Sequence, residues 1–201
     1  RQMCIRDSKK TVVSGGIGSI FSRFTLESPI KKDKSSFILA LRRSYADILF
    51  SPFLKNSGVF NDGSALNFYD ITAKANFDLD PKNTIFVSSY IGRDVFMFDE
   101  RQGFNWGNRT GTLRWNHLFN DRLFSNFTLI YSNYDYQLAF GSDDMNKFEW
   151  DSKVETYNFK PELTYFINAN NELSLGAEVI RYRFEPANAV GVSEGEISDI
   201  T

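Results

Sequence analysis

The chain has 201 residues and a formal net charge of −2, so it is long enough for one domain with a sizeable core. The charge and a pI of about 5.5 do not suggest a general nucleic-acid binder. Mean hydropathy is −0.34 and no run of about 20 apolar residues occurs, which excludes a transmembrane helix but not a transmembrane β-barrel.

The first eight residues, RQMCIRDS, match the translation of a transposase adapter that is used in sequencing libraries. We therefore interpret residues 1–8 as an adapter artefact and leave them out of the fold reasoning. The only cysteine, Cys4, falls in this segment, so residues 9–201 offer no disulfide or thiol chemistry. The authentic N-terminus, with any signal peptide, is then expected to lie upstream.

From about Phe37 to Tyr182, apolar and polar residues tend to alternate. In the stretch 69–79, one face would carry Tyr69, Ile71, Ala73, Ala75, Phe77 and Leu79, and the other Asp70, Thr72, Lys74, Asn76 and Asp78. A period of two predicts β-strands with one apolar and one polar face. The pattern fits either a soluble sheet or a barrel whose apolar face meets lipid and whose polar face lines a lumen.

About eight strands are predicted, in an antiparallel up-and-down meander: 11–30, 35–50, 65–79, 84–98, 104–119, 123–140, 151–167 and 172–185. Most exceed the roughly 5–6 residues of an ordinary globular strand, whereas a tilted membrane strand needs about 9–11 residues. Strand 84–98 lacks a clean alternation, so its register stays open.

Links of two kinds separate these strands. Short polar turns are predicted at 31–34, 80–83, 120–122 and 168–171, and longer links at 51–64, 98–103, 141–151 and from Pro186 onward. Alternation of short turns with long loops is typical of outer-membrane barrels. The fold class is therefore predicted as all-β, and the sheet as part of a larger transmembrane β-barrel.

Aromatic residues gather near the predicted short turns, for example Phe77, Trp115, Phe119 and Tyr165. Aromatic rings with a polar end, Tyr and Trp above all, suit a membrane interface. The single histidine, His117, shares the apolar face near such a turn, where an interfacial role is favoured over a metal ligand or base. Charges on the opposite face would fit a water-filled or plugged lumen.

Three motifs could carry other chemistry, and none is convincing. The glycines of 15–18 lack the spacing and the following helix of a phosphate loop. The acidic group Asp143, Asp144, Asn146 and Glu149 lacks the glycine and ligand spacing of an EF-hand, and a solvated loop is favoured. Glu155 and Glu162 would lie on opposite faces, so they form no acid–base pair. We predict no catalytic, metal or cofactor site and a protein that is not an enzyme.

Several segments in order resemble the beginning of the barrel in TonB-dependent outer-membrane receptors of the Bacteroidota. They are SRFTLESPIKKDKSSF (22–37), RRSYAD (42–47), GRDVF (92–96), FNWGN (104–108) and LRWNHLFN (113–120). The resemblance covers about residues 14–185. One departure is Ser28, where the family usually places glycine before Pro29.

The resemblance implies a barrel of about 22 strands that encloses a plug domain. Residues 9–201 would then form a partial barrel, without the plug, the TonB box and the remaining strands. The implied function is active transport of a scarce solute, such as an iron chelate, cobalamin or an oligosaccharide, across the outer membrane of a Gram-negative cell. The implied partners are membrane lipid, the solute and, through the missing segments, the TonB complex.

Solute contacts would come from outer loops and the upper lumen, where Phe53, Phe60, Asn61, Trp106 and Tyr136 are candidates. No single one of them is favoured over girdle or loop packing, so the solute-binding residues stay open. Two alternatives also stay open. One is a complete eight-stranded outer-membrane barrel with a structural or adhesive role, and the other is a soluble β-sandwich or lipocalin-like binding module.

Overall fold

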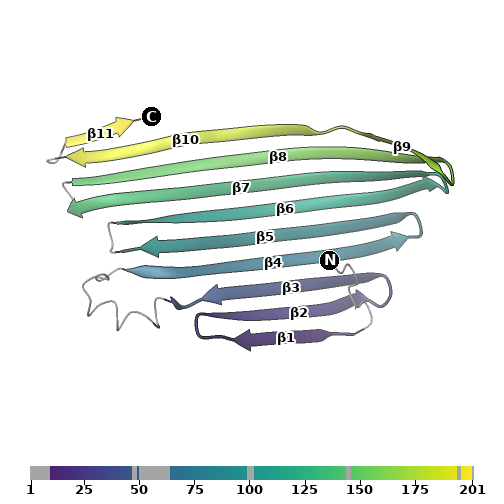
Figure 1. Ribbon diagram of the computed structural model, residues 1–201, viewed down its shortest axis with the longest axis horizontal. Helices are drawn as coiled ribbons and strands as arrows, with labels where there is room; N and C mark the ends of the chain where they lie inside the picture. Colours follow the sequence, from purple (N-terminus) through teal and green to yellow (C-terminus); the bar gives the residue numbers. More distant parts are fainter. Residues whose placement is uncertain are drawn as a thin grey trace.

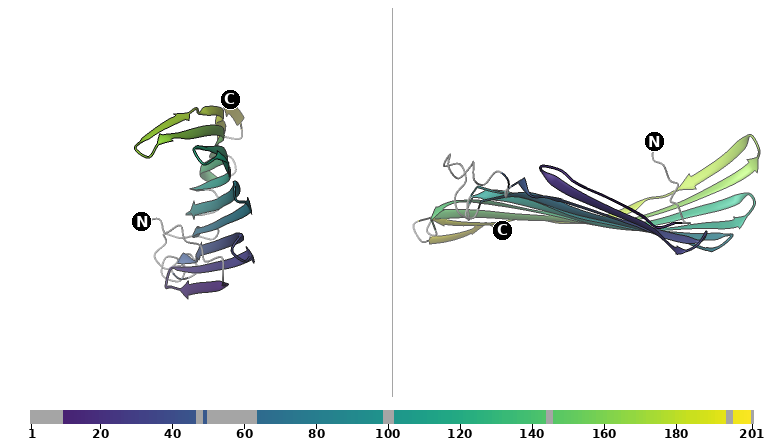
Figure 2. Two further views of the ribbon diagram at one scale, coloured as in Figure 1. Left: turned by 90° about the vertical axis from the view of Figure 1, so that its right-hand side faces the viewer. Right: turned by 90° about the horizontal axis from the view of Figure 1, so that it is seen from below.

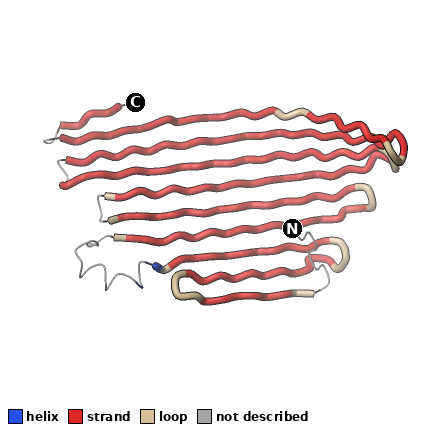
Figure 3. The backbone as a smooth tube through the Cα atoms, viewed as in Figure 1, coloured by secondary structure: helices blue, strands red, loops and turns tan. Residues whose placement is uncertain are grey.

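The computed structural model describes residues 10–46, 49, 64–98, 102–143, 146–193 and 196–200. In this part the chain forms one eleven-stranded antiparallel sheet (Figure 1), and almost all of its trace is strand (Figure 3). The strands are β1 Val12–Ile17, β2 Phe21–Lys31, β3 Ser35–Ser44, β4 Ala65–Asp80, β5 Asn83–Met97, β6 Gly103–Asn120, β7 Leu123–Asp143, β8 Asn146–Asn168, β9 Asn171–Gly176, β10 Val179–Ser193 and β11 Glu196–Ile200. The predicted all-β fold is confirmed.

The order of the strands in the sheet follows the order of the chain, which confirms the up-and-down meander. The path runs from β1 to β8 and on to β10 and β11. Strand β9 pairs with residues 162–168 of β8, and β10 begins its pairing with β8 at Phe159. Strands β9 and β10 are separated only by Ala177 and Glu178. Strands β1 and β11 lie at opposite edges of the sheet (Figure 1).

The sheet is a single twisted layer, as the edge-on views of Figure 2 show. Among the described residues, the only buried hydrophobic side chain is Ala46, whereas large apolar side chains along most strands are exposed. The described part therefore has no hydrophobic core, and strand pairing holds it together. No helix in this part is long and apolar enough to cross a membrane.

Three of the short turns share one device, in which the side-chain oxygen of an Asp or Asn accepts the backbone N–H two residues later. This is an Asx-turn, which explains why these residue types occur there. The bonds run from Lys82 to Asp80 (2.7 Å), from Arg122 to Asn120 (2.9 Å) and from Asn170 to Asn168 (3.0 Å). The predicted short turns are confirmed. We call the strand ends at which these turns lie the turn end of the sheet, and the opposite strand ends the loop end.

Backbone hydrogen bonds also tie each short turn to the next along the turn end. The N–H groups of Asp78, Leu118 and Phe166 donate to the carbonyls of Lys34, Lys82 and Arg122, at 2.7, 2.8 and 2.8 Å. A register irregularity accompanies each donor, between 78 and 80, 118 and 120, and 166 and 168. Between β4 and β8 the irregularities lie next to hairpin turns, so pairing is regular through the middle of these strands.

The predicted single strand 11–30 was wrong, because the chain reverses at residues 18–20. Strands β1 and β2 form a hairpin there, in which the N–H of Gly18 donates to the carbonyl of Phe21 at 2.9 Å. Gly15 and Gly16 pair with Phe24 and Arg23 as ordinary strand residues. No helix follows these glycines directly, as a phosphate loop would require.

The predicted long links at 141–151 and from Pro186 onward were also wrong. Strand β7 continues to Asp143 and β8 begins at Asn146, while β10 continues to Ser193 and pairs with β11. Charged and aromatic residues alternate at 147–151 within a paired strand, so the polarity of this segment does not mark the end of pairing. Most of the predicted link 51–64 lies outside the described residues.

We expect glycine to be required at position 103, the first residue of β6, which pairs with the last residue of β5. A Cβ there would overlap the carbonyl oxygen of Phe96 and lie 2.6 Å from the Cα of Met97, whereas a Cβ at Gly111 would meet nothing within 4 Å. Gly103→Ala should therefore lower the free energy of unfolding by about 1–3 kcal/mol, measured by urea unfolding in detergent. Gly111→Ala is the control, and an equal loss in both variants would contradict the explanation.

Candidate functional site

The antiparallel register fixes which side chains share a face of the sheet. Paired residues point to the same side and successive residues alternate. We call the side that carries Trp115 face A and the side that carries Asn116 face B. The open register of strand 84–98 is thereby resolved, since Ile85 pairs with Trp115 on face A and Phe86 with Arg114 on face B.

Face A carries an apolar band toward the turn end. One register row of the band is apolar across five strands: Val87, Leu113, Leu129, Phe159 and Val179. All but Phe159 belong to aliphatic types, and their exposed fractions include 50% for Leu129 and 64% for Val179. On β8 the band runs from Tyr157 to Tyr165, which fits the about 9–11 residues of a membrane-crossing strand.

At the turn end, the apolar band finishes with aromatic side chains whose ring nitrogens contact a polar group. The Nε1–H of Trp115 donates to Oδ1 of Asn83 at 3.0 Å, and Nδ1 of His117 lies 2.7 Å from the same oxygen. The ring of His117 also packs edge-on against Phe119, with centroids 4.4 Å apart. His117 thus lies where the sequence placed it, on the apolar face near a short turn. No cluster of three or more His, Cys, Asp or Glu that could hold a metal occurs in the described residues.

Face B is polar behind the apolar band. Glu162 on this face contacts Lys160 at 3.0 Å and accepts a hydrogen bond from Asn126 at 3.0 Å. Arg42 forms a 2.6 Å ion pair with Asp70 on the same face. The same length of strand therefore presents apolar side chains on one side and hydrogen-bonded, charged side chains on the other.

On strands β6, β7, β8 and β10 the polarity of face A changes at one level of the sheet, whereas on β2 to β5 it stays apolar at the same level (Phe24, Leu41, Ile71 and Ile91). We call the next register row the switch row: Ser89, Gly111, Tyr131, Tyr157 and Arg181. The row beyond it, toward the loop end, is mostly polar: Ile91, Arg109, Asn133, Glu155 and Arg183. Apolar side chains thus give way to charged ones over about four residues of strand, roughly 13 Å.

Beyond the switch row, face A carries a polar network. Nη2 of Arg93 lies 2.8 Å from the carboxylate of Asp135 and donates to Oδ1 of Asn105 at 2.7 Å. Nδ2 of Asn105 in turn donates to Gln137 at 3.0 Å. Arg93, Asp135 and Gln137 line a shallow pocket of about 230 Å³ together with Lys153. These residues come from four strands, which the register brings together.

Lys153 and Glu155 lie in the same polar part of face A, and each residue shifts the pKa of the other. Their charged atoms are 2.9 Å apart. The hydrogen bond from Lys153 lowers the pKa of Glu155 below its ordinary 4.5, and the same bond raises the pKa of Lys153 above its ordinary 10.5. The stabilisation of the folded chain by this ion pair is therefore present at neutral pH. It is lost as the pH falls through the lowered pKa of Glu155, or rises through the raised pKa of Lys153.

Face B becomes aromatic toward the loop end, farther along the strands than the level at which face A becomes polar. We call Phe96, Phe104, Trp106, Tyr136 and Trp150 the aromatic cluster; the first four lie on three adjacent strands. The rings of Phe96 and Phe104 stack with centroids 5.0 Å apart, and those of Phe104 and Trp106 at 5.4 Å with 8° between their planes. The two faces have thus exchanged polarity between the turn end and the loop end.

The structure brings together two of the five solute-contact candidates. Trp106 and Tyr136 are direct partners between β6 and β7. Phe53, Phe60 and Asn61 lie outside the described residues. Of the acidic group, Asp143 ends β7 and pairs with Asn146 at the start of β8, whereas Asp144 lies outside the described part. Glu155 and Glu162 lie on opposite faces, as predicted.

Sequence reasoning missed the exchange of polarity because it treated the polar segment 141–151 as a link. The signal was present in the alternation of Lys147, Glu149 and Asp151 with Phe148 and Trp150. These residues form paired strand, with the charged side chains on face A and the aromatic ones on face B. The period of two was therefore continuous, but the identity of its apolar face had changed.

A comparison with protein-family models finds no matching family, and a comparison with curated proteins finds no matching relative. The resemblance to TonB-dependent receptors that the sequence motifs indicate therefore stays a prediction.

We expect Lys153→Met to return the pKa of Glu155 toward its ordinary value, because the hydrogen bond that stabilises the carboxylate is removed. The measurement is a ¹³C-carboxyl NMR titration of glutamate-labelled chain in detergent micelles, with Glu155→Gln assigning the signal. Lys147→Met is the matched control, since Lys147 contacts Glu149 at 3.4 Å on the same face. A Glu155 signal that titrates identically in wild type and Lys153→Met would refute the proposed cause.

Proposed function

We propose that the chain is part of the β-barrel of a TonB-dependent outer-membrane receptor, which transports a scarce solute into a Gram-negative cell. The observation that carries the proposal is the change of face A from apolar to polar at the switch row, with face B polar behind the apolar band. A strand that crosses a bilayer and continues into water on the far side needs this change on its outer face. Its outer face meets lipid and then water, while its inner face lines a lumen throughout.

The apolar band has the properties of a lipid-facing surface. It is continuous across neighbouring strands, large side chains such as Leu129 are half exposed, and no element of the described chain covers it. In water, a contiguous apolar patch of this kind is found at interaction sites or leads to aggregation. In a bilayer, the same surface is solvated by acyl chains at no such cost.

The lengths of the strands also support the proposal. Strands β7 and β8 have 21 and 23 residues, so each extends about 70 Å. A hydrocarbon core is about 30 Å thick, and a tilted strand crosses it in about 9–11 residues. The remaining length lies beyond the bilayer, where a charged outer face such as the Arg93–Asp135 network is expected.

The two alternatives are less well supported. A soluble sandwich needs a second layer against the apolar face, and the described residues form a single layer. An eight-stranded barrel has fewer strands than the ten along the path from β1 to β11. The strand count thus favours a larger barrel.

We infer that the aromatic cluster forms part of the surface that contacts the solute. It lies beyond the bilayer on the side that would face the lumen. Its stacked rings, Phe96, Phe104 and Trp106, present flat apolar surface next to Asp94 and Tyr136. Apolar and aromatic walls with a few polar groups are the usual composition of a small-molecule site.

The three tryptophans test the placement of the bilayer, because Trp115 lies in the apolar band whereas Trp106 and Trp150 belong to the aromatic cluster. Single-tryptophan chains, made by Trp→Phe at the other two positions, are reconstituted in vesicles of phosphatidylcholine brominated near the headgroup end of its acyl chains. We expect strong fluorescence quenching of Trp115 by bromine, and strong quenching of Trp106 and Trp150 by aqueous iodide instead.

The same chains in vesicles without bromine serve as the control for the quenching measurement. Equal bromine quenching at all three positions, or none at Trp115, would contradict the placement of the apolar band in lipid. Recovery of a cooperatively unfolding monomer from water without detergent would also contradict it.

The transport function is tested on the complete reading frame that contains residues 9–201. We expect it to encode a plug domain before the barrel, and its deletion to abolish accumulation of one of three labelled probes: a ferric chelate, cyanocobalamin or a maltooligosaccharide. A protonophore should stop accumulation of that probe without stopping its binding to cells. An unrelated gene directly upstream, or unchanged uptake of all three probes, would oppose the proposal.

A further inference from the structure

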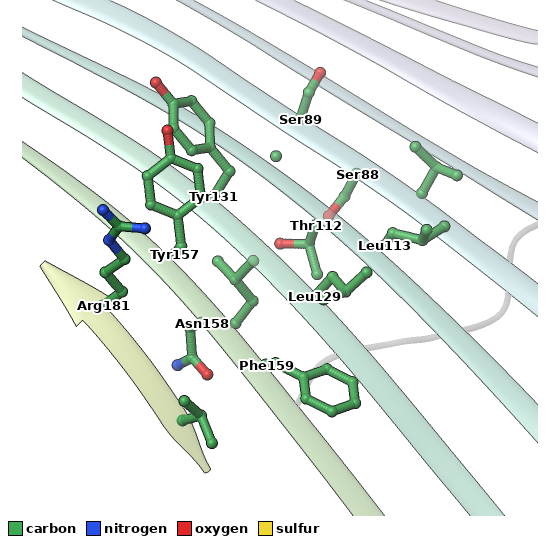
Figure 4. Close-up of a pocket in the computed structure, with 14 residues that line it drawn as sticks. Ser88, Ser89, Thr112, Leu113, Leu129, Tyr131, Tyr157, Asn158, Phe159 and Arg181 are labelled. Carbon is green, nitrogen blue, oxygen red and sulfur yellow. The ribbon is translucent and has the colours of Figure 1, made fainter.

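A groove of about 590 Å³ opens on the sheet around the switch row (Figure 4). It forms because Ser89 and Gly111 are small while Leu113 and Tyr131 beside them are large. A Cβ built at Gly111 would meet nothing within 4 Å, so the space above this residue is empty of protein. The volume lies within the range of roughly 300–1,000 Å³ for small-molecule sites.

The chemistry of the groove changes along the strand direction. Its turn-end side is formed by Leu113, Leu129 and Phe159, which belong to the apolar band. Its loop-end side is formed by Tyr131 and Tyr157, with ring centroids 5.1 Å apart, and by Arg181. The groove therefore has aliphatic side chains on its turn-end side and, on its loop-end side, two phenols with a guanidinium beside them in the same register row.

The positive charge at this end has no protein counterion. Other cations farther along face A are paired: Arg93 with Asp135, Lys153 with Glu155 and Arg183 with Glu185. Within the part of the chain that the structure describes, no ion pair or hydrogen bond of a side chain satisfies Arg181, or Arg109 on the next row. Arg181 lines the groove whereas Arg109 does not, so an anion at the loop-end rim would complement the charge of Arg181.

We propose that the groove binds one acyl chain of an anionic lipid, with the lipid phosphate at Arg181. This rests on the proposed function, in which face A meets the bilayer. The hydrocarbon of such a lipid would lie on the aliphatic turn-end side, and its ester region and phosphate at the phenols and the guanidinium of the switch row. Tyrosine is suited to this boundary because its ring is apolar and its hydroxyl is polar.

The test uses the 201-residue chain in phosphatidylcholine vesicles that contain trace spin-labelled lipid, either phosphatidylglycerol or phosphatidylcholine. The fraction of motionally restricted label, measured by electron paramagnetic resonance, reports lipid held by protein. We expect phosphatidylglycerol to be preferred about fivefold for each arginine that contacts it. Arg181→Gln should lower the preference by about that factor, while Arg43→Gln, an exposed arginine of face A that does not line the groove, should not.

Filling the groove gives an independent arm. Gly111→Leu should reduce the restricted fraction of both labelled lipids, whereas Ala73→Leu, on face A of β4 and outside the groove lining, should leave it unchanged. Insertion is followed separately by resistance to carbonate extraction. Insertion without a preference for phosphatidylglycerol, or an equal effect of Arg43→Gln, rejects the lipid site alone. Failure of the wild type to insert rejects the proposed function as well.

Discussion

The structure depends on the backbone hydrogen-bond ladder, because the described part of the chain has no hydrophobic core that could stabilise it instead. Strand pairing fixes the pleat, and the pleat assigns every side chain to one of two faces. A slip of one residue between β6 and β7, for example, would pair Leu113 with Thr128 and so put Leu113 and Leu129 on opposite faces. The ladder therefore determines the surface chemistry as well as the shape, and both faces are available to their surroundings.

The placement of irregularities protects this arrangement. Register shifts next to the short turns lie between 78 and 80, 118 and 120, and 166 and 168. Across the band and the switch row, pairing between β4 and β8 is unbroken. The Asx-turns and the hydrogen bonds between neighbouring turns set the starting position of each hairpin, so the apolar residues of successive strands meet at one level. Bulges in the middle of the strands would instead have staggered the band.

Much of this could be read from the sequence, and the failures have a common cause. Period-two alternation and Asp- or Asn-containing turns predicted the strands from 65 to 140, and the place of His117 on the apolar face near a short turn. The hairpin at 18–20 was missed because its strands have no charged or proline-containing link. Segment 141–151 was misassigned because polarity served as evidence for a loop, whereas Lys147 and Glu149 are strand residues facing away from Phe148. Registers across five strands, such as the switch row, depend on bulge positions that one strand's sequence does not reveal.

Apolar surface lies on face A toward the turn end and on face B toward the loop end. This distribution limits what could surround the sheet. A second protein layer on face A would cover the apolar band but would also cover the Arg93–Asp135 network, whose charges would then lose water. A layer on face B would cover the aromatic cluster but would also bury Glu162 and Lys160. No uniform packing partner suits either whole face. A medium that changes along the strand does suit both: lipid and then water outside, with a wet lumen whose upper wall is aromatic inside. That requirement, and not apolarity alone, is what separates a membrane barrel from a sandwich here.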